Sequence, residues 1–76
     1  MDVNKLVRMA NQIAANFEYG DDDAKKVAAV CDHLSRFWNS SMKAQLIQYR
    51  RSGDDGLTEL AASAVDQLAD KESDAA

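Results

Sequence analysis

The 76-residue sequence contains no proline and has only one cysteine, one histidine and three glycines. The lone Cys31 excludes an internal disulfide, and Cys31 with His33 cannot supply the four ligands of a structural zinc site. A chain of this length buries only about 60–65% of the surface that its unfolded form exposes. Because a disulfide and a structural metal are both excluded, association with a partner is the remaining way to reinforce so thin a core.

The sequence also lacks a long apolar run and an excess of positive charge. No stretch approaches the roughly 18–20 apolar residues that a membrane span needs, and the first residues lack the basic and apolar segments of a signal peptide. The formal net charge is −4, whereas nucleic-acid-binding domains are usually basic. We therefore expect a cytoplasmic protein whose partner is neither a nucleic acid nor a membrane, and a single reduced cysteine fits that compartment.

Side chains in the patterns that catalysis requires are missing too. Cys31 and His33 are two positions apart on a predicted helix, so they point to different sides and cannot form a nucleophile–base pair. The turn 53–56 lacks the lysine of a phosphate-binding loop and the widely spread oxygen ligands of a calcium loop. We predict no catalytic, cofactor-binding or metal-binding residue, and hence no enzyme activity of the chain itself.

What the sequence does contain is helical periodicity, which recurs four times. It predicts helices over about 2–18, 22–38, 41–52 and 58–69, separated by Gly20, by 39–41 and by the turn 52–56. The expected N-caps are Asp2, Ser40 or Ser41, and Thr58. The acidic turn 21–23 places negative charge at the start of the second helix, where the helix dipole favours it. The fold class is therefore all-α, a compact bundle of four short amphipathic helices in one domain (1–69), followed by a flexible acidic tail (70–76).

Each predicted helix has an apolar face that is expected to point inward. These faces comprise Val3, Leu6, Val7, Ala10, Ile13, Ala14 and Phe17; then Ala24, Val27, Ala28, Cys31, Leu34 and Trp38; then Met42, Leu46 and Tyr49; and finally Leu57, Leu60, Ala61, Ala64, Val65 and Leu68.

The second helix carries a further apolar row formed by Val30, His33 and Phe37. These residues are three and four positions apart and lie roughly 100° around the helix from the main apolar face. Either this helix is surrounded by the others and buries both rows, or one row is exposed for a partner. Exposed aromatic side chains are typical anchors of protein interfaces.

Charge is segregated along the chain. No acidic residue occurs between Asp32 and Asp54, whereas four basic residues, Arg36, Lys43, Arg50 and Arg51, fall in that interval. One interpretation is a basic patch that docks on an acidic partner surface. The other is a solvated helix face with ion pairs inside the chain. In the first helix, Asn11 flanks the apolar face and is expected to bond either to another helix or to a partner.

Three segments resemble the delta subunit of bacterial NAD-dependent formate dehydrogenases. They are Leu6–Ile13 (LVRMANQI), His33–Trp38 (HLSRFW) followed by Met42, and Gly53–Leu60 (GDDGLTEL). The resemblance extends from about residue 3 to residue 68. The sequence departs from the family at Asn39-Ser40, where the family usually has Asp-Pro. Because asparagine caps helices as aspartate does, the cap at this position is expected to survive.

The resemblance implies an accessory role in a larger enzyme. Those enzymes are cytoplasmic complexes that oxidise formate to carbon dioxide and reduce NAD. Their molybdenum or tungsten pterin, iron–sulfur clusters and FMN are carried by larger subunits. The delta subunit is understood to support a stable, active complex, or the insertion of the pterin cofactor. The expected partners of this chain are therefore the larger formate dehydrogenase subunits.

We predict that the partner-binding surface combines residues of the first and second helices. It comprises Arg8, Asn11, Gln12, His33, Arg36, Phe37 and Trp38. Arg36 would supply an oriented charge contact and Phe37 an apolar anchor. The alternative hypothesis is a free-standing helical adaptor or a homodimeric interaction module, and a homodimer is conceivable when the chain is isolated.

Overall fold

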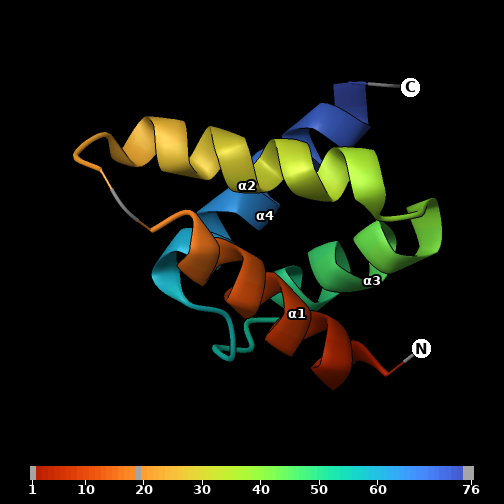
Figure 1. Ribbon diagram of the computed structural model, residues 1–76. Coiled ribbons are helices and arrows are strands. Elements are labelled where there is room, and N and C mark those ends of the chain that lie inside the picture. The colour runs from red at the N-terminus through yellow and green to blue at the C-terminus, as the bar shows by residue number, and fades with distance from the viewer. Residues whose placement is uncertain (1, 19, 75–76) are drawn as a thin grey trace.

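The computed structural model describes residues 2–18 and 20–74, which form four α-helices joined by short connections (Figure 1). The helices are α1 (Val3–Asn16), α2 (Asp23–Phe37), α3 (Ser40–Arg51) and α4 (Glu59–Asp74). The Cα radius of gyration is 11.3 Å, as expected for a compact domain of this length. The all-α prediction is confirmed.

Side-chain caps begin the first two helices, and the cap at Asp2 is the one that the sequence predicts. The backbone N–H of Asn4 donates to Asp2 Oδ1 at 3.0 Å, and the N–H of Lys25 donates to Asp22 Oδ1 at 3.2 Å. Each cap satisfies one of the free donors of a first helical turn. Between the two helices, Gly20 has φ +95°, a conformation that other residues rarely adopt.

The break between α2 and α3 differs from the sequence prediction in one detail. Trp38 is extended (ψ 141°) and is followed by Asn39, whose Oδ1 accepts from the N–H of Met42 at 2.9 Å. Asn39 is therefore the N-cap, and the assignment of Ser40 or Ser41 as the cap is wrong because α3 begins at Ser40. The cap expected to survive the departure from Asp-Pro is confirmed.

The fourth helix begins as predicted but ends later than predicted. Thr58 Oγ1 accepts from the N–H of Ala61 at 3.3 Å, which is the expected N-cap bond. The helix does not end near Ala69 but continues to Asp74. A helix end in the sequence was inferred from the loss of apolar periodicity, whereas the backbone hydrogen bonds that define a helix continue through polar residues. The flexibility of the tail and the domain boundary at residue 69 stay predictions.

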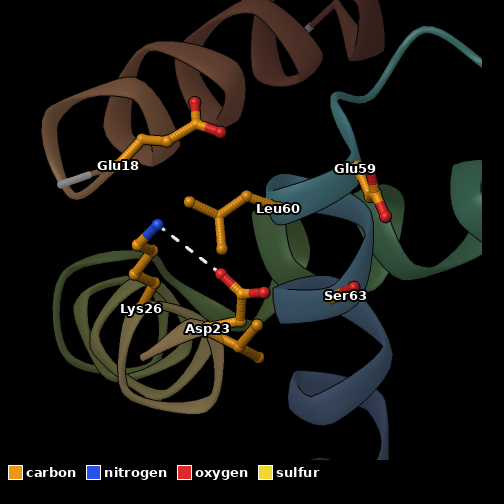
Figure 2. A pocket seen from close by; sticks show the side chains of 7 residues that line it. Glu18, Asp23, Lys26, Glu59, Leu60 and Ser63 are labelled. Carbon is orange, nitrogen blue, oxygen red and sulfur yellow. Dashed lines mark ion pairs between the residues drawn. The ribbon is translucent and has the colours of Figure 1, made fainter. Parts of the chain in front are cut away.

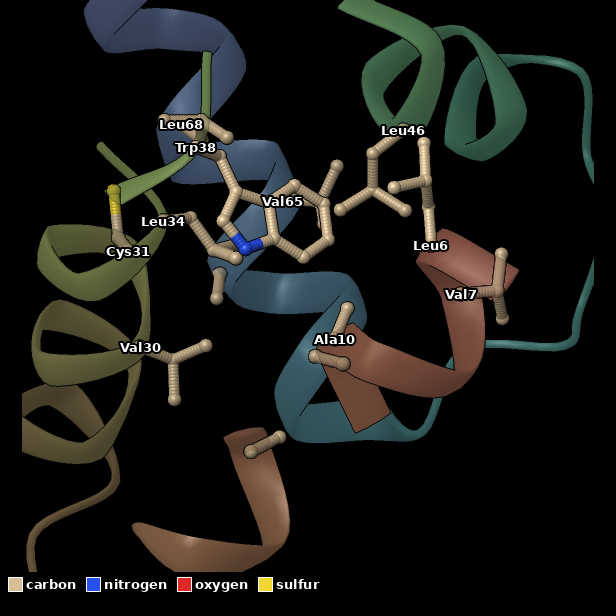
Figure 3. Packing of buried hydrophobic residues seen from close by; sticks show 13 residues of the cluster. Leu6, Val7, Ala10, Val30, Cys31, Leu34, Trp38, Leu46, Val65 and Leu68 are labelled. Carbon is tan, nitrogen blue, oxygen red and sulfur yellow. The ribbon is translucent and has the colours of Figure 1, made fainter. Parts of the chain in front are cut away.

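The core is formed by side chains from all four helices (Figure 3). The Trp38 indole lies at its centre, between Leu34 on one side and Leu46 and Leu6 on the other (Figure 3). The buried set is Leu6, Val7, Ala10, Ala14, Val30, Cys31, Leu34, Trp38, Leu46, Ala61, Ala64, Val65 and Leu68. This arrangement fixes which faces of α1 and α2 remain available at the surface.

The rotation of α2 differs from the prediction. Ala24 and Ala28 were expected to face inward but are exposed, whereas Val30, expected in the second row, is fully buried. The buried face of α2 is thus centred on its large apolar residues Val30 and Leu34. Burying those side chains removes more apolar surface from water than burying two alanines, so they determine how the helix turns toward the core.

Candidate functional site

The nucleophile and the base that the sequence offers are kept apart. Cys31 lies in the core, and burial raises the pKa of its thiol despite the nearby Lys71. A raised pKa disfavours the thiolate, which is the reactive form of cysteine. His33 instead points to the α1 side of α2, where its ring stacks on aromatic side chains. The structure therefore gives Cys31 a packing role.

The described residues do not form a metal site. Among residues 2–18 and 20–74, no group of three or more His, Cys, Asp or Glu side chains comes close enough to hold an ion. Within the same residues, no helix is both long and apolar enough to cross a membrane.

A surface hollow of about 210 Å³ lies where the end of α1, the start of α2 and the start of α4 meet (Figure 2). Lys26 turns toward Asp23 there, with 3.5 Å between Nζ and Oδ1. The other lining residues are Glu18, Val27, Glu59, Leu60 and Ser63. The side chain of Lys26 is 18% exposed and that of Asp23 is 94% exposed. Because Lys26 is paired with this carboxylate of its own helix, we assign the hollow no ligand.

The most distinctive surface feature is an aromatic ridge, formed by Phe17, His33 and Phe37. The Phe17 and His33 rings meet edge to face with centroids 6.2 Å apart, and the His33 and Phe37 rings are tilted with centroids 4.8 Å apart. Both separations fall in the range of favourable aromatic pairs. Phe37, at the outer end of the ridge, is 72% exposed.

A charged pair lies next to the ridge. Arg36 Nε is 3.1 Å from Asp32 Oδ2, one helical turn earlier on α2. The side chains are 71% and 53% exposed, so the pair contributes little stability. It holds the guanidinium close to Phe37 in an oriented position that solvent, or a partner, can reach.

Two of the predicted partner-binding residues have structural roles instead. Trp38 is only 6% exposed and packs in the core, so its place on a docking surface is a correction to the sequence prediction. Asn11 donates through Nδ2 to the Gly56 carbonyl and accepts at Oδ1 from the Thr58 N–H, both at 2.9 Å. Of the alternatives left open for Asn11, the structure realises a bond within the chain.

Asn11 belongs to a set of contacts that fixes the α3–α4 connection. The Tyr49 hydroxyl accepts from the Gly56 N–H at 3.0 Å, and a Cβ at position 56 would collide with that hydroxyl. Gly53 takes a positive φ of +88° in the same connection. Asn11 anchors this loop to α1 and Tyr49 anchors it to α3, which gives a structural role to Asn11 in the first of the three resembling segments and to Gly56 in the third.

The remaining predicted residues lie on the exposed part of α1. Arg8 and Gln12 are both exposed, and neither makes a side-chain hydrogen bond or ion pair with the described residues. The structure thus brings His33, Arg36 and Phe37 together and leaves Arg8 and Gln12 apart from them on another helix. Phe17 was expected on the inward face of α1 and is half-buried against the core, but its ring also meets His33, a contact that sequence reasoning missed.

The basic interval is largely neutralised within the chain. Lys43 Nζ is 2.8 Å from Glu72 Oε1, and Arg50 Nε is 3.0 Å from Asp66 Oδ1, in addition to the Arg36–Asp32 pair. The bidentate bond to Asp66 raises the pKa of the Arg50 guanidinium. The interpretation as a helix face with internal ion pairs therefore holds for three of the four residues, and Arg51 makes no ion pair with the described residues.

The chain matches a known family over most of its length. The family model for the NADH-dependant formate dehydrogenase delta subunit FdsD matches residues 5–65. This range includes the Asn11 contacts, the whole aromatic ridge and the first part of α4. No curated protein and no solved structure gives a significant match.

Proposed function

The chain belongs to the family of NADH-dependent formate dehydrogenase delta subunits, and we propose that it is a non-catalytic accessory subunit that binds the larger subunits of such an enzyme. Its role is to support assembly or stability of the complex, or insertion of the pterin cofactor. We place the complex in the cytoplasm, with the molybdenum or tungsten pterin, iron–sulfur clusters, FMN and NAD on the larger subunits.

The observation that supports this proposal most directly is the exposure of Phe37. Its side chain is 72% exposed on a small domain whose other described large apolar residues are buried or partly buried. An exposed aromatic ring at the C-terminal end of α2 has the character of an interface anchor. We propose the aromatic ridge and Arg36 as the centre of the docking surface, with Arg8 and Gln12 as further contacts.

The chain's own chemistry is consistent with a role without catalysis. Cys31 is buried and its thiol is held in the protonated form, and the polar amide of Asn11 is used to anchor a loop. The exposed side chains at the ridge, Phe37 and Arg36, are of the kind that bind a protein surface rather than activate a substrate.

Co-purification from the native cytoplasm tests the proposal. The tagged wild-type chain should recover the large formate dehydrogenase subunits in a fixed ratio, with molybdenum or tungsten and iron in the eluate. The Phe37→Ala variant should recover much less of them, while its circular dichroism matches that of the wild type. Recovery of the bait alone, or of an unrelated protein, would favour a free-standing adaptor.

The isolated chain provides the complementary test. We expect no formate-dependent reduction of NAD by the purified subunit, and restored or more durable activity when it is added to complexes assembled without it. Turnover by the isolated chain would contradict the accessory role.

A further inference from the structure

We infer that the docking surface fits an apolar pocket of the partner whose rim carries a carboxylate, and that this carboxylate takes the Arg36 guanidinium over from Asp32. The inference rests on the proposed function, because the partner is taken to be a larger formate dehydrogenase subunit. The contact would extend along one side of α2, from Phe37 toward Lys25.

The shape of the ridge favours a pocket on the partner side. Phe37 projects with 72% of its surface exposed, and its ring is supported by His33, whose ring is supported in turn by Phe17. A side chain that is already held in place loses little conformational freedom on binding. A projecting, supported aromatic ring is best complemented by a concave apolar site, as hot-spot aromatics usually are.

The aromatic ridge borders a surface hollow at its Phe17 end. A space of about 370 Å³ lies beyond Phe17, and its lining also includes Gly20, Asp21, Asp22, Lys25, Lys26 and Ala29, so two carboxylates and two ammonium groups border it. Ala29, His33 and Phe37 are four residues apart, so they follow one line along α2. A partner whose pocket binds Phe37 can therefore contact a continuous surface along α2.

The charges beside this line identify the chemistry of the partner's rim. Lys25 lies on the same line as Ala29 and His33, Arg36 lies on the neighbouring row of α2, and both are exposed; Lys25 makes no ion pair with the described residues. Asp32 is the acidic residue between them, and it is engaged with Arg36. On a chain with a net charge of −4, Arg36 is the exposed cation beside Phe37, and it is this group, rather than the mixed charges of the hollow, that a partner carboxylate would contact and that would orient the complex.

The Arg36–Asp32 pair makes the inference testable through opposite effects. A partner carboxylate must compete with Asp32 for the guanidinium, so removing the charge of Asp32 should help binding while reversing the charge of Arg36 should hinder it. If the pair only stabilised α2, both changes would act through helix content instead.

The test measures binding of full-length variants to the co-expressed large subunits by titration at two salt concentrations. Phe37→Ala and Arg36→Glu should each weaken binding at least about tenfold, and Asp32→Asn should leave it unchanged or tighten it. Arg36→Glu should also reduce the salt dependence of binding. Arg51→Glu, the same charge reversal on exposed α3, is the matched control and should bind like the wild type.

Three outcomes would overturn the inference while leaving the accessory role intact. In the first, the wild type binds and Phe37→Ala binds equally well. In the second, Arg36→Glu and Arg51→Glu weaken binding equally. In the third, Asp32→Asn weakens binding although its helix content is unchanged. A doubled mass of the isolated chain that Phe37→Ala abolishes would show that a second copy occupies the ridge, and would overturn it too. If the wild type does not bind the large subunits at all, the proposed function itself fails.

Discussion

Phe37 and Trp38 are adjacent in the sequence and end up in opposite environments. The indole of Trp38 is 6% exposed at the centre of the core, whereas the ring of Phe37 is 72% exposed on the surface. The helix ends between them, since Phe37 is the last residue of α2 and Trp38 takes an extended conformation. One short segment therefore supplies both the largest core residue and, among the described residues, the most exposed aromatic ring, and the two should respond in opposite ways to truncation.

The largest effect is expected for Trp38→Ala. Truncating a buried tryptophan typically costs about 3–5 kcal/mol, and a single small core rarely supplies more than that amount in total. The purified variant should therefore lose its helical circular dichroism at room temperature or unfold at very low urea. A cost below about 1 kcal/mol would contradict the central position of the indole.

A smaller effect is expected for Asn11→Ala, which tests whether Asn11 is structural like Trp38 or a surface residue like Phe37. The change removes two hydrogen bonds to the α3–α4 connection, worth about 1–2 kcal/mol together. Urea unfolding measures the loss, and Gln12→Ala, its exposed neighbour, serves as the control with a change near zero. Equal values for the two variants would show that the amide bonds contribute nothing in solution.

The sequence predicted much of this architecture because local signals agreed. Helical periodicity located all four helices, and Asp2 and Thr58 cap helices as expected. The rotation of α2 was not predictable, because two apolar rows compete on that helix and only tertiary packing decides between them. The ending of α4 at Asp74 likewise depends on backbone bonds that a polar sequence does not reveal.

The candidate site was predicted only in part, for a related reason. The row of His33 and Phe37 stood out by its spacing, but spacing could not show that Val30 of the same row is buried. Phe17 continues the apolar face of α1, and its ring contact with His33 joins the end of α1 to the next helix, α2. Such pairings depend on how α1 and α2 cross.

The buried thiol provides a pH-dependent test of the core. Burial raises the pKa of Cys31 above its ordinary value of 9.0, so the unfolded chain releases the thiol proton at lower pH than the folded chain. The contribution of this thiol to the free energy of unfolding is therefore intact below about pH 9. It falls above that pH, by at most about 1.4 kcal/mol per pH unit. Urea unfolding at pH 8 and pH 10 should show a smaller fall for Cys31→Ala than for the wild type; an equal fall would mean the thiol is accessible.

The smallest stability effect is expected for Phe37→Ala. Because the ring is mostly exposed, its removal should change the free energy of unfolding by no more than about 0.5 kcal/mol. Thermal unfolding of the purified chain measures this change beside that of Trp38→Ala. A loss comparable with that of Trp38→Ala would place Phe37 in the core and remove the basis for the ridge as a docking surface.

The most direct test of the accessory-subunit account is site-specific photo-crosslinking in the native cytoplasm. A photoreactive phenylalanine analogue replaces Phe37 in one variant and Arg51, on α3, in another. The account predicts a crosslink from position 37 to a large formate dehydrogenase subunit and little or none from position 51. Crosslinks to that subunit from position 51 alone, or from neither position, would contradict the account.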